Sequence, residues 1–150
     1  MTEKISPEIP ITRSVAILII MNRKVLLVRH EEGAGHLTGV YGLPAGRPDF
    51  EEEEDLDIAV RELEQETGLI ARREDLEGFP DSYYEAEIPR KDGSIIRASM
   101  QVYVANNFSG ELKPNEETTP EWKTFKEVKL LDREGKLLPN VLKAVQTAKK

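Results

Sequence analysis

The chain has 150 residues, with 28 Asp and Glu against 21 Lys and Arg, and it has no cysteine. This length predicts one domain with its own hydrophobic core. The formal net charge of -7 argues against a nucleic-acid polymer as partner, because binding its phosphates requires a surplus of basic side chains. The lack of cysteine excludes disulfides, thiolate zinc sites and a cysteine nucleophile. The longest apolar run, residues 15–21, is too short to span a membrane and follows no signal peptide, so we expect a cytoplasmic protein with no membrane partner.

The hydrophobic pattern and the turn residues divide the chain into an arm and one mixed domain. Residues 1–12 contain two prolines, which disfavour a helix, so we expect an extended arm before a single domain over residues 13–150. The first expected elements are a hairpin of strands 14–21 and 24–30 turning at 22–23, a loop 31–38, a strand 40–43, a loop 44–50 and a helix 53–67. They are followed by strands 76–88 and 95–106 around a turn at 91–93, a loop 110–121, a strand 122–125 and a helix opened by Pro139. This order predicts a layered α/β fold of the α+β kind.

The expected helix ends at Gly68 and places Glu62, Gln65 and Glu66 on one side, next to the side that packs. Carboxylates one turn apart that face the same way are hard oxygen ligands suited to Mg²⁺ or Mn²⁺. A solvated acidic face is the alternative, because runs of charge usually lie on the surface. Spacing alone favours the surface interpretation.

The negative charge is concentrated around this helix. Ten of the 28 acidic residues lie between Gly46 and Leu69, together with only two of the 21 basic residues. A bound divalent cation would reverse this local charge and allow a small phosphorylated ligand to bind.

The segment from Gly46 to Leu69 resembles the Nudix box of the Nudix hydrolase superfamily, in its MutT-type form. The family pattern is a Gly, five residues, a Glu, seven residues, then Arg-Glu-apolar-any-Glu-Glu-any-Gly-apolar, and this chain has Arg61-Glu62-Leu63-Glu64-Gln65-Glu66-Thr67-Gly68-Leu69. The resemblance implies a Nudix-type α/β/α sandwich with a mixed β-sheet between helices. It also implies hydrolysis of a pyrophosphate linkage in a nucleoside triphosphate or another small molecule linked to a nucleoside diphosphate.

The loop before the helix departs from the family pattern by one residue. Six residues instead of five separate Gly46 from Glu53, and Glu53 is preferred to Glu52 because Glu52 would point away from Arg61. The resemblance assigns structural roles to Glu53, Arg61 and Gly68, with the Glu53 and Arg61 pair holding the loop against the helix.

The resemblance further implies catalysis with Mg²⁺ or Mn²⁺. The expected metal ligands are oxygen donors in or near the box: the Gly46 carbonyl, Glu62, Gln65, Glu66 and Glu116. Gln65 stands where the family usually has a Glu and adds no charge, so we expect at least one cation to bind more weakly. The expected catalytic residues are Glu62, Glu66 and Glu116, with Glu117 as the alternative to Glu116. Either Glu62 or this loop pair would take the proton from a water that attacks phosphorus directly.

Three further residues are candidates for substrate contact: Arg29, His30 and Arg47. The adjacent Tyr83 and Tyr84 face opposite ways on a strand, and neither receives a role. The expected partner is a small-molecule nucleotide, and the chain is expected to be a monomer or a homodimer. The altered loop and Gln65 motivate an alternative function, a catalytically weakened nucleotide-binding module on the Nudix fold.

Overall fold

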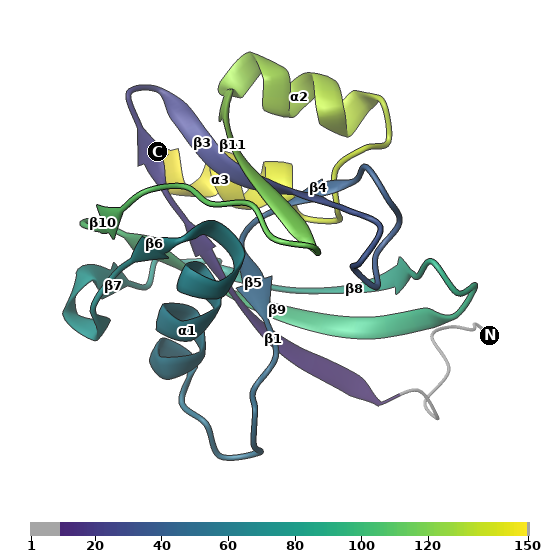
Figure 1. Cartoon of the computed structure of the whole chain (residues 1–150), viewed down its shortest axis with the longest axis horizontal. Coiled ribbons are helices and arrows are strands. Elements are labelled where there is room, and N and C mark those ends of the chain that lie inside the picture. Colours follow the sequence, from purple (N-terminus) through teal and green to yellow (C-terminus); the bar gives the residue numbers. More distant parts are fainter. Residues whose placement is uncertain (1–9, 150) are drawn as a thin grey trace.

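A computed structural model describes residues 10–149 and has a mixed α+β fold with curled sheets between helices, which confirms the predicted fold class (Figure 1). The elements are β1 (Ile11–Leu18), β2 (Ile20–Met21), β3 (Lys24–His30), β4 (Tyr41–Gly42), β5 (Ala45–Gly46), α1 (Asp55–Thr67), β6 (Leu69–Ile70), the 3-10 turn η1 (Arg73–Asp75), β7 (Leu76–Glu77), β8 (Tyr83–Pro89), β9 (Ile95–Ala105), β10 (Ser109–Gly110), β11 (Thr118–Thr124), α2 (Phe125–Arg133) and α3 (Val141–Lys149). Among the described helices, none is long and apolar enough to cross a membrane.

The strands form two main sheets. In the first, β1 runs parallel to β9 over its whole length and antiparallel to β5, while β7 and β8 pair with β9. In the second, β3 pairs with β11, β2 and β4, all antiparallel. A short ribbon of β6 and β10 adjoins α1 at its C-terminal end. The parallel pair makes the first sheet mixed, as predicted.

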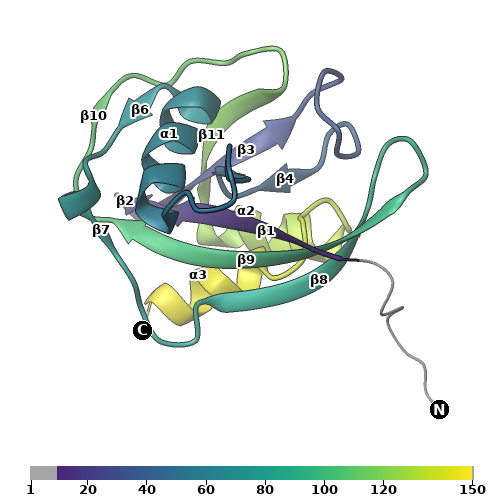
Figure 2. The same ribbon diagram turned by 90° about the horizontal axis from the view of Figure 1, so that it is seen from below.

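Strand β1 contributes to two hydrophobic cores, one on each face. Val15 and Ile17 pack in a cluster with α1, whereas Ala16 and Leu18 pack in a second cluster with α2 and α3. Successive side chains of a strand point to opposite faces, so an unbroken apolar run satisfies both cores at once. The helices therefore cover both sides of the sheets, in the predicted α/β/α order (Figure 2).

The predicted N-terminal hairpin is wrong over most of its length. Only Ile20 and Met21 pair with β3, across a turn at Asn22 and Arg23 whose φ angles are 53° and 63°. Residues 14–18 instead pair with β9, whose partner residues lie 86 positions later in the chain, as in the pair of Ser14 with Met100. The full burial of this run on both faces is typical of a strand inside a layered sheet, and it gave no local signal of its distant partner.

Other elements differ in their bounds. Helix α2 was not predicted from the sequence, and it is capped by reciprocal hydrogen bonds between Thr124 and Glu127. The strand expected at 122–125 begins earlier, at Thr118, and the run 76–88 divides into β7 and β8. Residues 1–9 of the expected arm lie outside the described residues, and Ile11 and Thr12 already belong to β1.

Candidate active site

Helix α1 carries the acidic residues of the candidate site and ends at Gly68. This glycine has a φ of 86°, and its N–H donates to the Glu64 carbonyl. A Cβ at this position would also lie 2.5 Å from the carbonyl oxygen of Glu111. Both the backbone conformation and the close approach of the following loop therefore require glycine here.

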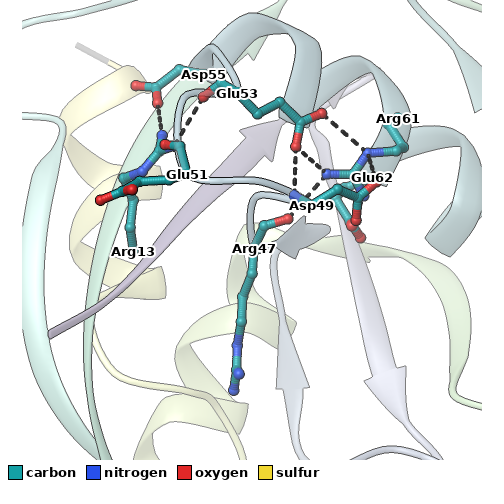
Figure 3. Close-up of polar contacts among 8 residues, drawn as sticks. All are labelled: Arg13, Arg47, Asp49, Glu51, Glu53, Asp55, Arg61 and Glu62. Carbon is teal, nitrogen blue, oxygen red and sulfur yellow. Dashed lines mark hydrogen bonds and ion pairs between the residues drawn. The ribbon is translucent and has the colours of Figure 1, made fainter. Parts of the chain in front are cut away.

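An ion pair between Glu53 and Arg61 holds the preceding loop against α1 (Figure 3). Glu53 is 8% exposed, and its Oε1 accepts hydrogen bonds from Arg61 Nη2 at 2.8 Å and from the Asp49 N–H at 2.7 Å. These donors lower the pKa of Glu53. Arg61 Nη2 also donates to the Arg47 carbonyl at 3.0 Å. The structure thus accommodates the extra loop residue with Glu53, not the exposed Glu52, against Arg61.

A second anchor for this loop comes from β1 and was not found in the sequence. Arg13 Nη1 pairs with Asp55 at 2.7 Å, and Arg13 Nη2 donates to the Glu53 carbonyl at 2.9 Å (Figure 3). Arg13 is far from the box in sequence, and only the pairing of β1 with β5 brings it to the loop. The turn before α1 is therefore held from both sides.

The Glu62 carboxyl lies directly against Gly46. A Cβ on Gly46 would lie 2.0 Å from Glu62 Cδ, so only glycine leaves room for the carboxyl in this position. Strand β5 fixes Gly46 by pairing it with Val15 of β1. Burial raises the pKa of Glu62 in spite of its ion pair with Arg61.

Glu66 lies one turn further along α1 and is more deeply buried. Its Oε1 accepts a hydrogen bond from the Ala45 N–H at 2.9 Å. Burial and, to a smaller extent, the charges of Glu62 and Glu117 raise the pKa of Glu66 to about 8, against the effect of the Ala45 N–H. The carboxylates of this cluster thus lie close enough to oppose one another's ionisation.

Asn115 determines which loop glutamate joins the cluster. Its Nδ2 donates to the Gln65 carbonyl at 2.7 Å, and its Oδ1 accepts from the Glu117 N–H at 2.7 Å. Glu117 lines a cavity of about 410 Å³, called the main cavity below, and raises the pKa of both α1 carboxylates, Glu62 and Glu66. Glu116 lines only a smaller adjoining hollow, where Gln65 also lies. The structure thus places Glu117 at the centre, and Glu116 and Gln65 at the rim.

These oxygen atoms fit a divalent cation in their chemistry. Carboxylates that oppose one another's ionisation, with Glu62 against the backbone of Gly46, supply the oxygen donors that hard cations prefer. Within residues 10–149, no three His, Asp or Glu side chains already converge as a metal-binding group. Glu62 is engaged by Arg61 and Glu66 by Ala45, so binding a cation requires these side chains to exchange partners.

The acidic cluster forms one end of the main cavity. His30 and Arg47 line it, as does Arg90, which the sequence analysis did not single out. His30 is 6% exposed, with its Nδ1 atom 3.1 Å from the Val40 carbonyl, and burial lowers its pKa. Arg29 does not line the cavity, because its guanidinium pairs with Glu31 at 3.0 Å and with Glu121 at 2.8 Å.

Comparison with known proteins identifies the family and the fold. The family model of the NUDIX domain matches residues 10–144. No curated protein matches the chain. A MutT NUDIX hydrolase from Burkholderia pseudomallei is similar in structure with a TM-score of 0.70 at 19% identity, over 92% of this chain and 98% of that one.

Two other solved structures carry different activities in their names. A C. elegans Ap4A hydrolase has a TM-score of 0.60 at 14% identity, over 93% of this chain and 96% of that one. A bifunctional NMN adenylyltransferase/ADP ribose pyrophosphatase from Francisella tularensis, complexed with AMP and a Mn ion, has a TM-score of 0.62 at 17% identity, over 94% of this chain and 42% of that one. At these identities the likeness establishes the fold alone.

Proposed function

Since the chain belongs to the Nudix hydrolase family, we propose that it is a metal-dependent hydrolase of a nucleotide. The bond cleaved is a pyrophosphate linkage in a nucleoside triphosphate or in another small molecule linked to a nucleoside diphosphate. The observation that carries this proposal is the gathering of Glu62, Glu66 and Glu117 at one end of the 410 Å³ cavity. The cavity is large enough for a small ligand, and its lining also includes basic and apolar side chains.

Mg²⁺ or Mn²⁺ would be held by the carboxylates of Glu62, Glu66 and Glu117 and by the Gly46 carbonyl, with Gln65 at the rim. When bound, such a cation neutralises charge on the phosphates and lowers the pKa of a water molecule. The Francisella tularensis protein described above contains a Mn ion, which supports this choice of cofactor. The raised pKa of Glu66 supports it as well, because a neighbouring cation favours its ionised form.

The side chains of the chain itself position the reactants. Glu62 or Glu117 accepts the proton of the water that attacks phosphorus, and no covalent enzyme intermediate forms. Arg47 and Arg90, which line the cavity, offer guanidinium groups to the phosphate oxygens. Positioning and charge stabilisation then supply most of the acceleration, as is general for phosphoryl transfer.

A panel of nucleotides tests the proposal. The purified chain is incubated with nucleoside triphosphates, dinucleoside polyphosphates and ADP-ribose in MgCl2, and the nucleotide products are separated by ion-exchange chromatography and quantified. Turnover that stops on addition of EDTA supports the proposal. Tight nucleotide binding without turnover contradicts it and supports the catalytically weakened binding module. No nucleotide affinity at all contradicts both.

Gln65→Glu is expected to strengthen Mg²⁺ binding without abolishing turnover. The added carboxylate lies at the rim of the cluster, beside Glu62 and Glu66, and supplies the charge that an amide lacks. Mg²⁺ titrations of the hydrolysis rate should give half-saturation at a several-fold lower concentration than in the wild type. An unchanged titration would contradict a position of residue 65 next to the metal.

Glu117→Gln is expected to reduce kcat more strongly than Glu116→Gln. The two residues are adjacent in one loop and differ in that only Glu117 lines the main cavity. Loss of one base or ligand carboxylate costs about 10²-fold or more in rate. Steady-state kinetics of the matched pair measure the difference. An equal loss in both variants, or a larger loss in Glu116→Gln, would contradict the placement of Glu117 at the centre.

A further inference from the structure

The cavity continues away from the acidic cluster over a floor made by β8 and β9, which lie side by side (Figure 2). Three register pairs line this floor: Tyr84 with Met100, Ala86 with Ala98, and Ile88 with Ile96. The middle pair has only methyl side chains, so the floor is hollowed between two rows of larger side chains. A flat apolar ring fits such a hollow.

Two polar atoms of residues that line the cavity have no hydrogen-bond partner among the described residues. Tyr84 is 7% exposed, and its buried hydroxyl makes no hydrogen bond. The Nδ1 atom of His36, from the loop between β3 and β4, is also buried and unpaired. Buried polar groups in folded proteins are nearly always hydrogen-bonded, because leaving one unpaired costs free energy. A ligand that supplies the missing hydrogen bonds would remove this cost.

The surroundings of His36 keep its ring neutral. Its ring lies edge-on to that of His30, with 4.7 Å between the ring centroids. Burial, with smaller contributions from the neighbouring His30, Arg90 and Arg47, lowers the pKa of His36 to about 4. A neutral imidazole offers one donor and one acceptor, and a tyrosine hydroxyl offers both. These groups suit the neutral, hydrogen-bonding edge of a heterocycle better than a phosphate.

We propose that Tyr84 and His36 recognise polar atoms of a nucleobase whose face lies on Ala86 and Ala98, and that they set the base preference of the site. This rests on the proposed function, because the acidic cluster at the other end of the same cavity takes the phosphates. Tyr84 and His36 are thus specificity residues, and the reaction itself proceeds without them.

Calorimetric binding of the four ribonucleoside monophosphates and of ribose 5-phosphate tests this proposal without requiring turnover. The wild type should bind one monophosphate at least about tenfold more tightly than ribose 5-phosphate. Tyr84→Phe should weaken that binding about tenfold, the value of one lost hydrogen bond at a buried ligand, and leave ribose 5-phosphate unchanged. His36→Phe, which keeps a ring against His30, should reduce the differences in affinity among the four ribonucleoside monophosphates.

Tyr83→Phe is the matched control, because Tyr83 is 53% exposed on the opposite face of β8 and its hydroxyl donates to Glu85. It should bind every ligand as the wild type does. The proposal is overturned if the wild type binds ribose 5-phosphate as tightly as every monophosphate, or if Tyr84→Phe binds all of them as the wild type does. Absence of hydrolysis in the nucleotide panel would overturn the proposed function separately.

Thermal unfolding of the ligand-free protein gives a second readout. Tyr84→Phe removes an unpaired buried hydroxyl and should raise Tm by about 2–4 °C. A hydroxyl with a structural role would behave in the opposite way, so a fall in Tm would overturn the proposal. If Tyr84 recognises the base, Tyr84→Phe should both raise Tm and weaken the affinity for the preferred monophosphate.

Discussion

Glu66→Gln is expected to lower kcat by about 10³-fold, the largest effect of any single substitution considered for this chain. Glutamine keeps the size of the side chain and can still accept the hydrogen bond from the Ala45 N–H. It removes the charge that would hold a divalent cation against the phosphates, and charge stabilisation of this kind is worth several kcal/mol in the transition state. Steady-state kinetics at saturating Mg²⁺ measure the loss.

The same substitution is expected to stabilise the metal-free protein at alkaline pH. Burial raises the pKa of Glu66 from 4.5 to about 8, so the folded protein holds a proton there that the unfolded chain releases. This contribution to stability is fully present below pH 4.5 and is lost as the pH rises through 8. Glutamine does not ionise, so Glu66→Gln avoids the stability that the wild type loses at alkaline pH. This difference corresponds to a few kcal/mol in the free energy of unfolding, or about 5–10 °C in Tm.

Thermal unfolding in EDTA at pH 5 and at pH 8.5 checks this linkage. The wild type should lose Tm between the two conditions, whereas Glu66→Gln should lose much less. Glu64→Gln is the matched control, because Glu64 is an exposed carboxylate on the same helix and lines only a separate surface hollow. Equal pH dependence of wild type and Glu66→Gln would show that Glu66 ionises normally in the folded protein.

The parts of the fold that could be predicted from the sequence are those with a local signal. The helix was predicted within two residues at its N-terminus, since its apolar spacing and Gly68 lie within one short segment. The Glu53 and Arg61 pair followed from the resemblance to the Nudix box, and helical geometry selected Glu53 instead of Glu52 because Glu53 is eight positions before Arg61. The final helix and the β8 to β9 hairpin also had nearby turn residues.

The parts that could not be predicted depend on contacts between distant segments. Nothing in residues 14–18 indicates pairing with β9 instead of β3, because an apolar run fits either neighbour. The choice between Glu116 and Glu117 depends on Asn115, which binds the backbone of α1 some fifty residues earlier. Arg29 is an arginine at a strand end like many phosphate ligands, and only the ion pair with Glu121 across the sheet removes it from the cavity.

Gly46→Ala is expected to lower kcat by about 10²-fold while the protein remains folded. The new Cβ would lie 2.0 Å from Glu62 Cδ, so the Glu62 carboxyl must move away from its position. Displacing a reacting group by about 1 Å is enough for a 10²-fold loss. Gly46 does not need a positive φ, so alanine is compatible with the backbone of β5 and the loss should come from the site alone.

Gly78→Ala is the control for the glycine substitution, because the Cβ would meet only the Tyr103 ring at 4.0 Å and the backbone has no positive φ. It should retain wild-type kcat. If Gly46→Ala acts by displacing Glu62, its effect should disappear in a Glu62→Gln background, since interacting sites are not additive. A further 10²-fold loss in the double variant would mean that residue 46 acts independently of Glu62, through its own carbonyl, and would contradict the steric account.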